Sequence, residues 1–127
     1  MALAPGPRAR IQVTVGPEDL ATALGSGDVP VLGTPRLLAL AEAATVQAVQ
    51  GRLDPGTTSV GTRVELDHLA ASPPGAQVEI TAELTEVHGR RLVFTVTATE
   101  GERTVARGVV ERTVVDRDRF LARLGGG

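Results

Sequence analysis

A chain of 127 residues falls in the usual size range of one compact domain, and 42% hydrophobic with 22% charged residues is typical of a globular protein. The net charge of −2 argues against nucleic acid as a partner, since phosphate binding needs a basic excess. The absence of Cys excludes disulfides and a cysteine nucleophile, and two histidines are too few for a histidine-rich metal cluster. No segment has the apolar length of a signal peptide or membrane span, so we expect a cytoplasmic protein with no membrane partner.

The first third of the chain predicts a short strand, a short helix and a loop. Alternating apolar residues over 10–15 predict the strand, and the sequence Pro17-Glu18-Asp19 favours a helix start that continues to Leu24. The glycine-rich stretch 25–30 lacks the Lys-Ser/Thr ending of a phosphate-binding loop, so we interpret it as a connector.

One long helix is predicted over Pro35 to Gln50. Thr34 supplies a hydroxyl cap, Pro35 suits the first helical position, and Gly51 is a natural stop. Apolar residues cover almost every side of this segment, which is typical of a buried helix.

Everything after the helix is predicted to be strand, apart from a short helical tail over 116–124. The predicted strands are 57–69, 77–87, 91–100 and 104–115, and His88-Gly89 is predicted to form a hairpin turn. One buried helix followed by long antiparallel strands predicts an α+β fold in a single domain over 1–127, with a flexible tail at 1–9 and a frayed end at 125–127. Long edge strands are commonly protected by pairing with another chain, so we expect a homodimer.

Glu42 is the most informative residue in the helix. It is the only acid between Pro35 and Gln50, and its neighbours are apolar. An ionised carboxylate is costly to bury without a partner. One interpretation is a helix face that meets solvent or an Arg across a dimer interface. The other is a carboxylate whose pKa is raised by burial and which acts as a general base.

Thr34, His68 and Arg112 are further candidates for chemistry. Thr34 is explained as a helix cap, but the N–H groups at a helix start can also hold a developing oxyanion. His68 shares strand parity with Val60, Val64 and Leu66, which points its imidazole toward the helix and toward Glu42. Arg112 has inward parity as well, with a rim salt bridge as the alternative. His88 is expected to be an exposed turn residue.

Helix geometry limits how these residues can meet. Thr34 and Glu42 are eight residues apart, about 12 Å along a continuous helix. Either the entry loop folds back, or a site joins Thr34 of one subunit to Glu42 of another.

The sequence from Val31 to Leu38, then Glu42, Ser59 to Thr62 and His68, resembles the fluoroacetyl-CoA thioesterase-like branch of the hotdog superfamily. The resemblance covers roughly residues 25–121. It implies a dimeric hotdog thioesterase with its active site at the subunit interface. By position, Thr34, Glu42 and His68 correspond to the catalytic set, and Gly61 and Arg112 to substrate-binding positions.

The resemblance also implies a substrate and suggests an alternative. The acyl donor of this branch is usually coenzyme A, a substrate rather than a bound cofactor, so we expect no cofactor. The name-giving enzyme has an aromatic lid before the helix, whereas residues 24–33 contain no aromatic, so a general short acyl-CoA is the expected substrate. We interpret the protein as an acyl-CoA thioesterase. The alternative is a hotdog dimer that binds an acyl-CoA or a small hydrophobic ligand without cleaving it.

Overall fold

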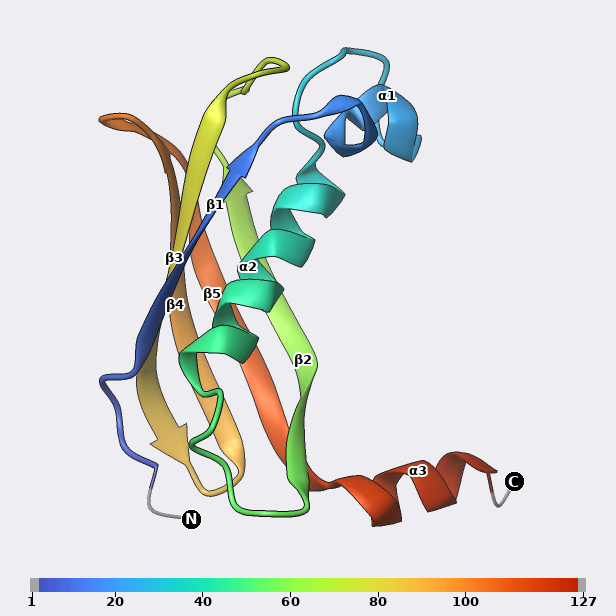
Figure 1. The fold of residues 1–127 in the computed structure, drawn as a ribbon, viewed down its shortest axis with the longest axis vertical. Coiled ribbons are helices and arrows are strands. Elements are labelled where there is room, and N and C mark those ends of the chain that lie inside the picture. Colours follow the sequence, from blue (N-terminus) through green and yellow to red (C-terminus); the bar gives the residue numbers. More distant parts are fainter. Residues whose placement is uncertain (1–2, 126–127) are drawn as a thin grey trace.

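The computed structural model describes residues 3–125. In chain order the elements are β1 (Arg8–Thr14), η1 (Pro17–Asp19), α1 (Ala21–Leu24), α2 (Thr34–Ala48), β2 (Thr57–His68), β3 (Gln77–His88), β4 (Arg91–Glu100), β5 (Arg103–Asp116) and α3 (Arg117–Gly125). The strands form one antiparallel sheet in the order β1-β3-β4-β5-β2. Figure 1 shows α2 running along this sheet, which confirms the predicted α+β fold with one long helix.

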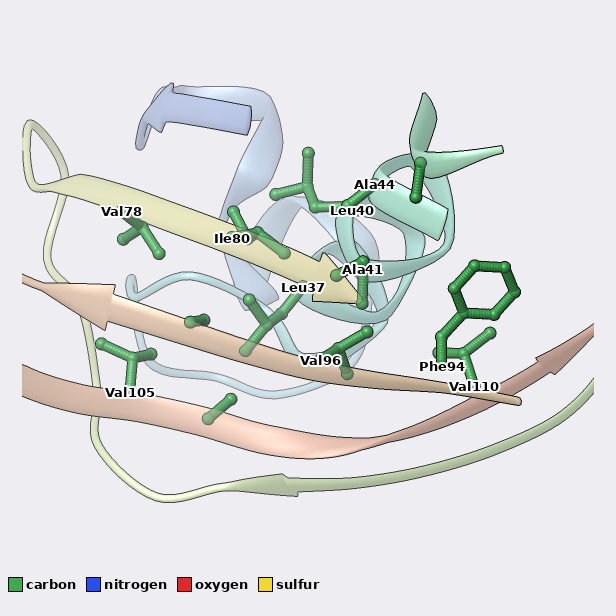
Figure 2. Close-up of a cluster of buried hydrophobic side chains, with 14 of the residues drawn as sticks. Leu37, Leu40, Ala41, Ala44, Val78, Ile80, Phe94, Val96, Val105 and Val110 are labelled. Atoms are coloured by element: carbon green, nitrogen blue, oxygen red, sulfur yellow. The ribbon is translucent and has the colours of Figure 1, made fainter. Parts of the chain in front are cut away.

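The core lies between α2 and the face of the sheet that the helix covers. From α2, the side chains of Leu37, Leu40, Ala41 and Ala44 are buried, and they face buried residues of β3, β4 and β5 such as Ile80, Phe94 and Val110 (Figure 2). Burying one such large side chain is worth roughly 1.5–3 kcal/mol. This packing fixes α2 against the sheet, and with it every side chain that α2 contributes to a site.

The opposite face of α2 is not covered in the single chain. Ala39 and Ala43 are exposed, and Val46 keeps 46% of its surface accessible. The prediction of a helix buried on almost all sides is therefore wrong for one chain alone. The mixture of small and apolar residues on this face is nevertheless unusual for a helix that meets only solvent.

A bulge in β2 changes which of its residues face the helix. Gly61 pairs with Arg112 and Arg63 with Glu111, so Thr62 is an extra residue in β2. After the bulge, Val64 and Leu66 pack against the core as predicted. Before it, Gly61 faces the helix. The simple alternation that grouped Val60 with the later residues is therefore wrong at that position.

The two ends of the chain differ in how they join the sheet. Residues 6 and 7 already exchange backbone hydrogen bonds with Leu84, and β1 begins at Arg8, earlier than predicted. At the other end, α3 leads away from the foot of β5, past the β2 edge (Figure 1). The predicted tails at positions 1–2 and 126–127 lie outside the described residues.

Candidate active site

Thr34 occupies a different helical position from the predicted one. The cap of α2 is Gly33, Thr34 is the first helical residue, and no side chain caps the helix. The interpretation of Thr34 as a cap is therefore wrong. Its hydroxyl is hydrogen-bonded instead to Nδ1 of His68, with an Oγ1 to Nδ1 distance of 2.7 Å. This distance is typical of a hydroxyl and the base that activates or orients it.

His68 lies at the end of β2 and its ring is partly buried. Burial lowers the pKa of His68 below the ordinary value of 6.5, and a backbone group of Ala70 opposes this effect to a smaller extent. The neutral imidazole therefore dominates at neutral pH. Its second nitrogen, Nε2, is buried without a hydrogen-bond partner among the described residues. A buried polar atom without a partner is costly, which is expected where a ligand or another chain completes the site.

An open cavity of about 300 Å³ lies beside Thr34 and His68. Its other walls come from α1, the loop before α2 and the segment after β2, and include Ser26, Val31 and Leu69. These residues are small or aliphatic. The cavity therefore offers space for a small group next to the Thr34 hydroxyl, without an aromatic ring above it.

Asp19 holds the start of α2 in place. Its carboxylate accepts hydrogen bonds from Nε of Arg36 and from the backbone N–H of Gly16, both at 2.8 Å, and its carbonyl accepts one from Gly33 at 2.9 Å. Asp19 is only 3% exposed. Sequence reasoning missed this role, because an acid after Pro17 looks like an ordinary first-turn residue, and nothing local shows that its partner is Arg36.

Glu42 belongs to a second group of residues, about two turns along α2. Its Oε2 lies 3.6 Å from Nη1 of Arg112, which comes from β5. A Cβ added at Gly61 would overlap the Glu42 carboxylate, so only glycine leaves room for Glu42 in this position. The predicted inward direction of Arg112 is confirmed, since the residue is 7% exposed.

Arg112 is itself fixed by β2. Its Nε donates to Ser59 Oγ at 2.8 Å, and its Nη2 donates to the Ser59 carbonyl at 3.1 Å. Burial lowers the pKa of Arg112, and the nearby charge of Glu42 raises it, so the guanidinium remains a cation. Ser59 is thus a supporting residue that sequence reasoning did not single out. Its signal lies in the bulge, which turns Ser59 and Gly61 to the same face as Val64 and Leu66.

The two groups do not meet within one chain. Thr34 and Glu42 are separated by about 12 Å of helix. Gly61 and His68 are separated by about 20 Å of strand. The side chain of Glu42 remains 36% exposed, and its ion-pair partner is Arg112 rather than His68. The acid–base pair predicted between Glu42 and His68 is therefore not formed inside a single chain.

Other candidate features do not add a site. His88 is exposed at the end of β3 and pairs with Glu86 at 2.7 Å, as expected for a residue beside a turn. Within residues 3–125, no three His, Asp or Glu side chains are grouped so that they could hold a metal ion. In that same part of the chain, no helix is both long and apolar enough to cross a membrane.

Comparisons with known proteins identify the family to which this chain belongs. Residues 15–118 match the family of fluoroacetyl-CoA-specific thioesterases. The chain belongs to this family. The fluoroacetyl-CoA thioesterase of Streptantibioticus cattleyicolor is 40% identical over 94 residues, covering 74% of this chain and 68% of that protein.

Solved structures show the same fold over the whole chain. A structure of a fluoroacetyl-CoA thioesterase has a TM-score of 0.90 at 32% identity and covers 99% of this chain and 98% of its own. A thioesterase superfamily member from Thermus thermophilus has a TM-score of 0.90 at 26% identity, covering 98% and 93%. The fold is therefore the hotdog fold, and the protein is a thioesterase, a hydrolase that acts on thioester bonds.

Proposed function

We propose that this thioesterase is a homodimer that hydrolyses a short acyl-CoA at two composite sites. Each site combines Thr34 and His68 of one subunit with Glu42, Gly61 and Arg112 of the other. The observation that carries the proposal is the separation of the two groups: each is held together by its own contacts, and one chain does not bring them together.

The free edge of β2 offers a way to join the two groups. β2 is an edge strand of the sheet and carries both Gly61 and His68. Antiparallel pairing of two β2 edges about a twofold axis brings the first half of one strand beside the second half of the other. The same pairing covers the exposed face of α2, with Ala43 and Val46, which a single chain leaves open.

The chemistry divides between the two groups. Glu42 accepts a proton from the water that attacks the thioester carbonyl, and the carbon–sulfur bond breaks as the acid forms. The proton then passes to the sulfur of coenzyme A. The Thr34 hydroxyl donates a hydrogen bond to neutral His68, so its oxygen is free to accept one from the attacking water and to orient it. Arg112 lies 3.6 Å from the Glu42 carboxylate and holds it in position.

A second mechanism is favoured by the bond between Thr34 and His68. Thr34 has no adjacent base in its own helix, but His68 supplies one at 2.7 Å, a distance suited to activating a nucleophile. Attack by Oγ1 would pass its proton to His68 and then to the leaving sulfur of coenzyme A, and would leave an acyl group on Thr34 that water hydrolyses in a second step. Mass spectrometry of protein quenched during turnover distinguishes the two mechanisms, because only the second adds an acyl mass to Thr34.

The substrate we propose is a short, non-fluorinated acyl-CoA, with coenzyme A as part of the substrate rather than a bound cofactor. The relative from Streptantibioticus cattleyicolor is named for fluoroacetyl-CoA. The cavity beside Thr34 is small and its walls are aliphatic, which suits a short acyl chain. Residues 24–33 supply no aromatic ring that would single out a fluorinated group.

Mixing two inactive variants tests the composite site. Thr34→Ala and Glu42→Gln each remove one half, and a change in a catalytic acid or base typically costs 10²- to 10⁴-fold in rate, on the order of the loss expected for Glu42→Gln. After unfolding and refolding together, half of the dimers are mixed, and each mixed dimer has one intact site. Activity should return to about a quarter of the wild-type value, as twofold symmetry dictates.

Activity that does not return on mixing would contradict the composite site. If the site lay within one chain, no mixed dimer would contain an intact site, and activity would stay at the level of the separate variants. Glu79→Gln is the matched control, because Glu79 is an acid of β3, away from the β2 edge, whose carboxylate pairs with Arg10. A panel of acyl-CoAs, followed with a thiol reagent, tests the substrate. Binding without turnover of any of them would support a non-catalytic role.

A further inference from the structure

We propose that α3 of each subunit covers the Thr34–His68 cavity of the other subunit and packs on its rim. The inference rests on the proposed function, because it uses the same dimer. It adds a role for the C-terminal helix, which makes no contribution to the site of its own chain. The partner it requires is a second copy of this chain.

The position of α3 is the first observation. The helix follows β5 directly, and the last residue of β5, Asp116, pairs with the first residue of β2, Thr57. Figure 1 shows α3 passing beyond the β2 edge at the foot of the sheet. Nine residues of helix extend about 13 Å. That length exceeds the spacing of two strands, so α3 reaches well over a chain paired on this edge.

The surface of α3 is the second observation. No residue of the helix is buried, although its sequence is amphipathic. Phe120, Leu121 and Leu124 lie on one side of it, and Leu121 and Leu124 are 54% and 69% exposed. Large apolar side chains gathered on one exposed helix face indicate a surface that another element covers.

A second exposed apolar set, called the rim here, lies on the segments that carry the cavity at the other end of the sheet, and its Leu69 lines the cavity. Leu24 ends α1, Val29 lies in the loop before α2, and Leu69 follows His68; they are 42%, 56% and 50% exposed. Together with Val46 on α2, these three and the two leucines of α3 are the exposed large hydrophobic residues of the described chain. Each chain therefore has one apolar set at each end of β2.

The dimer needed to complete the site brings these two sets together. Antiparallel pairing that places Gly61 level with the other subunit's His68 also places Thr57 level with the residues just after that His68. Leu69 is the first of them. The foot of one sheet, where α3 emerges, thus meets the rim of the other cavity. Charge agrees with this contact, since α3 carries three Arg and one Asp, and the rim loop carries Asp28.

Covering the cavity has a consequence for catalysis. The cavity is open in the single chain, and water in it would weaken the hydrogen bonds around the thioester. A helix from the other subunit would exclude that water and hold the acyl group near Thr34. It would take the place of a lid within the chain, since the short residues of 24–33 cannot close over the cavity themselves.

Cross-linking in this cysteine-free chain tests the contact directly. The variant Leu24→Cys with Leu124→Cys, and the variant Leu69→Cys with Leu124→Cys, should form cross-linked dimers under mild oxidation. A link within one chain is excluded, because the two positions lie at opposite ends of the sheet. Arg8→Cys with Leu124→Cys is the control, since Arg8 is exposed on the far edge strand β1. Each single-cysteine variant serves as a second control.

A kinetic measurement tests the role in catalysis. Leu121→Ser with Leu124→Ser should lower kcat/KM about tenfold, mainly through KM, while light scattering still shows a dimer. Ala122→Ser, on the other side of α3 and without a change of charge, should leave kcat/KM within about twofold. The proposal for α3 is wrong if the dimer persists and the mixed-variant assay succeeds, but no rim cysteine links to residue 124. A monomeric protein would overturn the composite site together with it.

Discussion

The Thr34–His68 group and the Glu42–Arg112 group are built in different ways. The first is a single hydrogen bond of 2.7 Å beside a cavity, with an imidazole whose pKa is lowered by burial. The second is an ion pair of 3.6 Å on the face of a helix, supported by two hydrogen bonds from Arg112 to Ser59. The first group is neutral, and the second carries charges of both signs.

This difference shows what each group requires from its surroundings. A neutral hydroxyl–imidazole pair tolerates partial burial, since no ion loses its hydration. A carboxylate needs a cation beside it, and Arg112 provides one where apolar residues of α2 would not. In the proposed dimer, this separation lets each group form in its own environment before a second chain brings the two together.

The largest expected effect on kcat/KM comes from Gly61→Ala. This variant disturbs the charged Glu42–Arg112 group and leaves the Thr34–His68 group intact. The new methyl group would occupy the place of the Glu42 carboxylate, so Glu42 must move away from Arg112. A displacement of about 1 Å at a catalytic group can cost 10²-fold in rate. We expect kcat/KM to fall by about that factor. Thermal unfolding should change little, because the end of the Glu42 side chain can move without moving the backbone.

Gly108→Ala is the comparison variant, because it should affect stability rather than activity alone. A Cβ at Gly108 would overlap the backbone of Glu65 and Leu66 in the neighbouring strand β2. Backbone cannot yield as a side chain does, so this variant should lose stability and fold poorly. If Gly61→Ala were as unstable as Gly108→Ala, the close approach at Gly61 would serve the fold rather than the position of Glu42.

A change of pH should have an intermediate effect on kcat/KM, and it acts on the neutral Thr34–His68 group. Because burial lowers the pKa of His68, the imidazole stays neutral down to a pH below 6.5. As the pH falls through the lowered pKa, protonation removes the acceptor for the Thr34 hydroxyl. We expect kcat/KM to decrease about tenfold for each further pH unit. The acid side of the profile should therefore begin below pH 6.5, and His68→Gln should abolish that limb.

The free energy of unfolding should also decrease as the pH falls. The unfolded chain takes up a proton on His68 near pH 6.5, whereas the folded chain resists it. The unfolded state binds more protons between these two values, so the free energy of unfolding decreases as the pH falls through this interval. Denaturant unfolding of wild type and His68→Gln at pH 7 and pH 5 measures the contribution. A wild-type protein that gains stability on acidification relative to the variant would contradict the burial of His68.

Sequence patterns were sufficient for most of the fold. Apolar alternation predicted the four long strands within two residues at either end, and Gly51 and Pro35 marked the long helix closely. The bulge at Thr62 could not be predicted from alternation, since one extra residue inverts the facing of every earlier residue in β2. The exposed side of α2 was also missed, because an apolar sequence does not tell whether its own chain or another covers it.

The candidate site was predictable in part. The facing of His68 and Arg112 follows from strand parity, because His68 lies after the bulge of β2 and Arg112 lies in a regular stretch of β5. The bond between Thr34 and His68 joins residues 34 positions apart, and helix-start rules favoured a cap instead. Asp19 was missed for the same reason: its role depends on Arg36, which is brought close only when η1 packs beside the start of α2.

The smallest expected effect therefore comes from Asp19, which touches neither group's reacting atoms. Asp19→Asn keeps the size of the side chain but removes the charge that binds Arg36, so the start of α2 can shift and take Thr34 with it. We expect kcat to fall about threefold with KM unchanged, and unfolding to become easier by about 1 kcal/mol. Arg36→Lys keeps a cation near Asp19 and should preserve kcat. Should Asp19→Asn lose stability but keep full kcat, then Asp19 secures the fold alone, and the Thr34–His68 bond holds its geometry without help from η1.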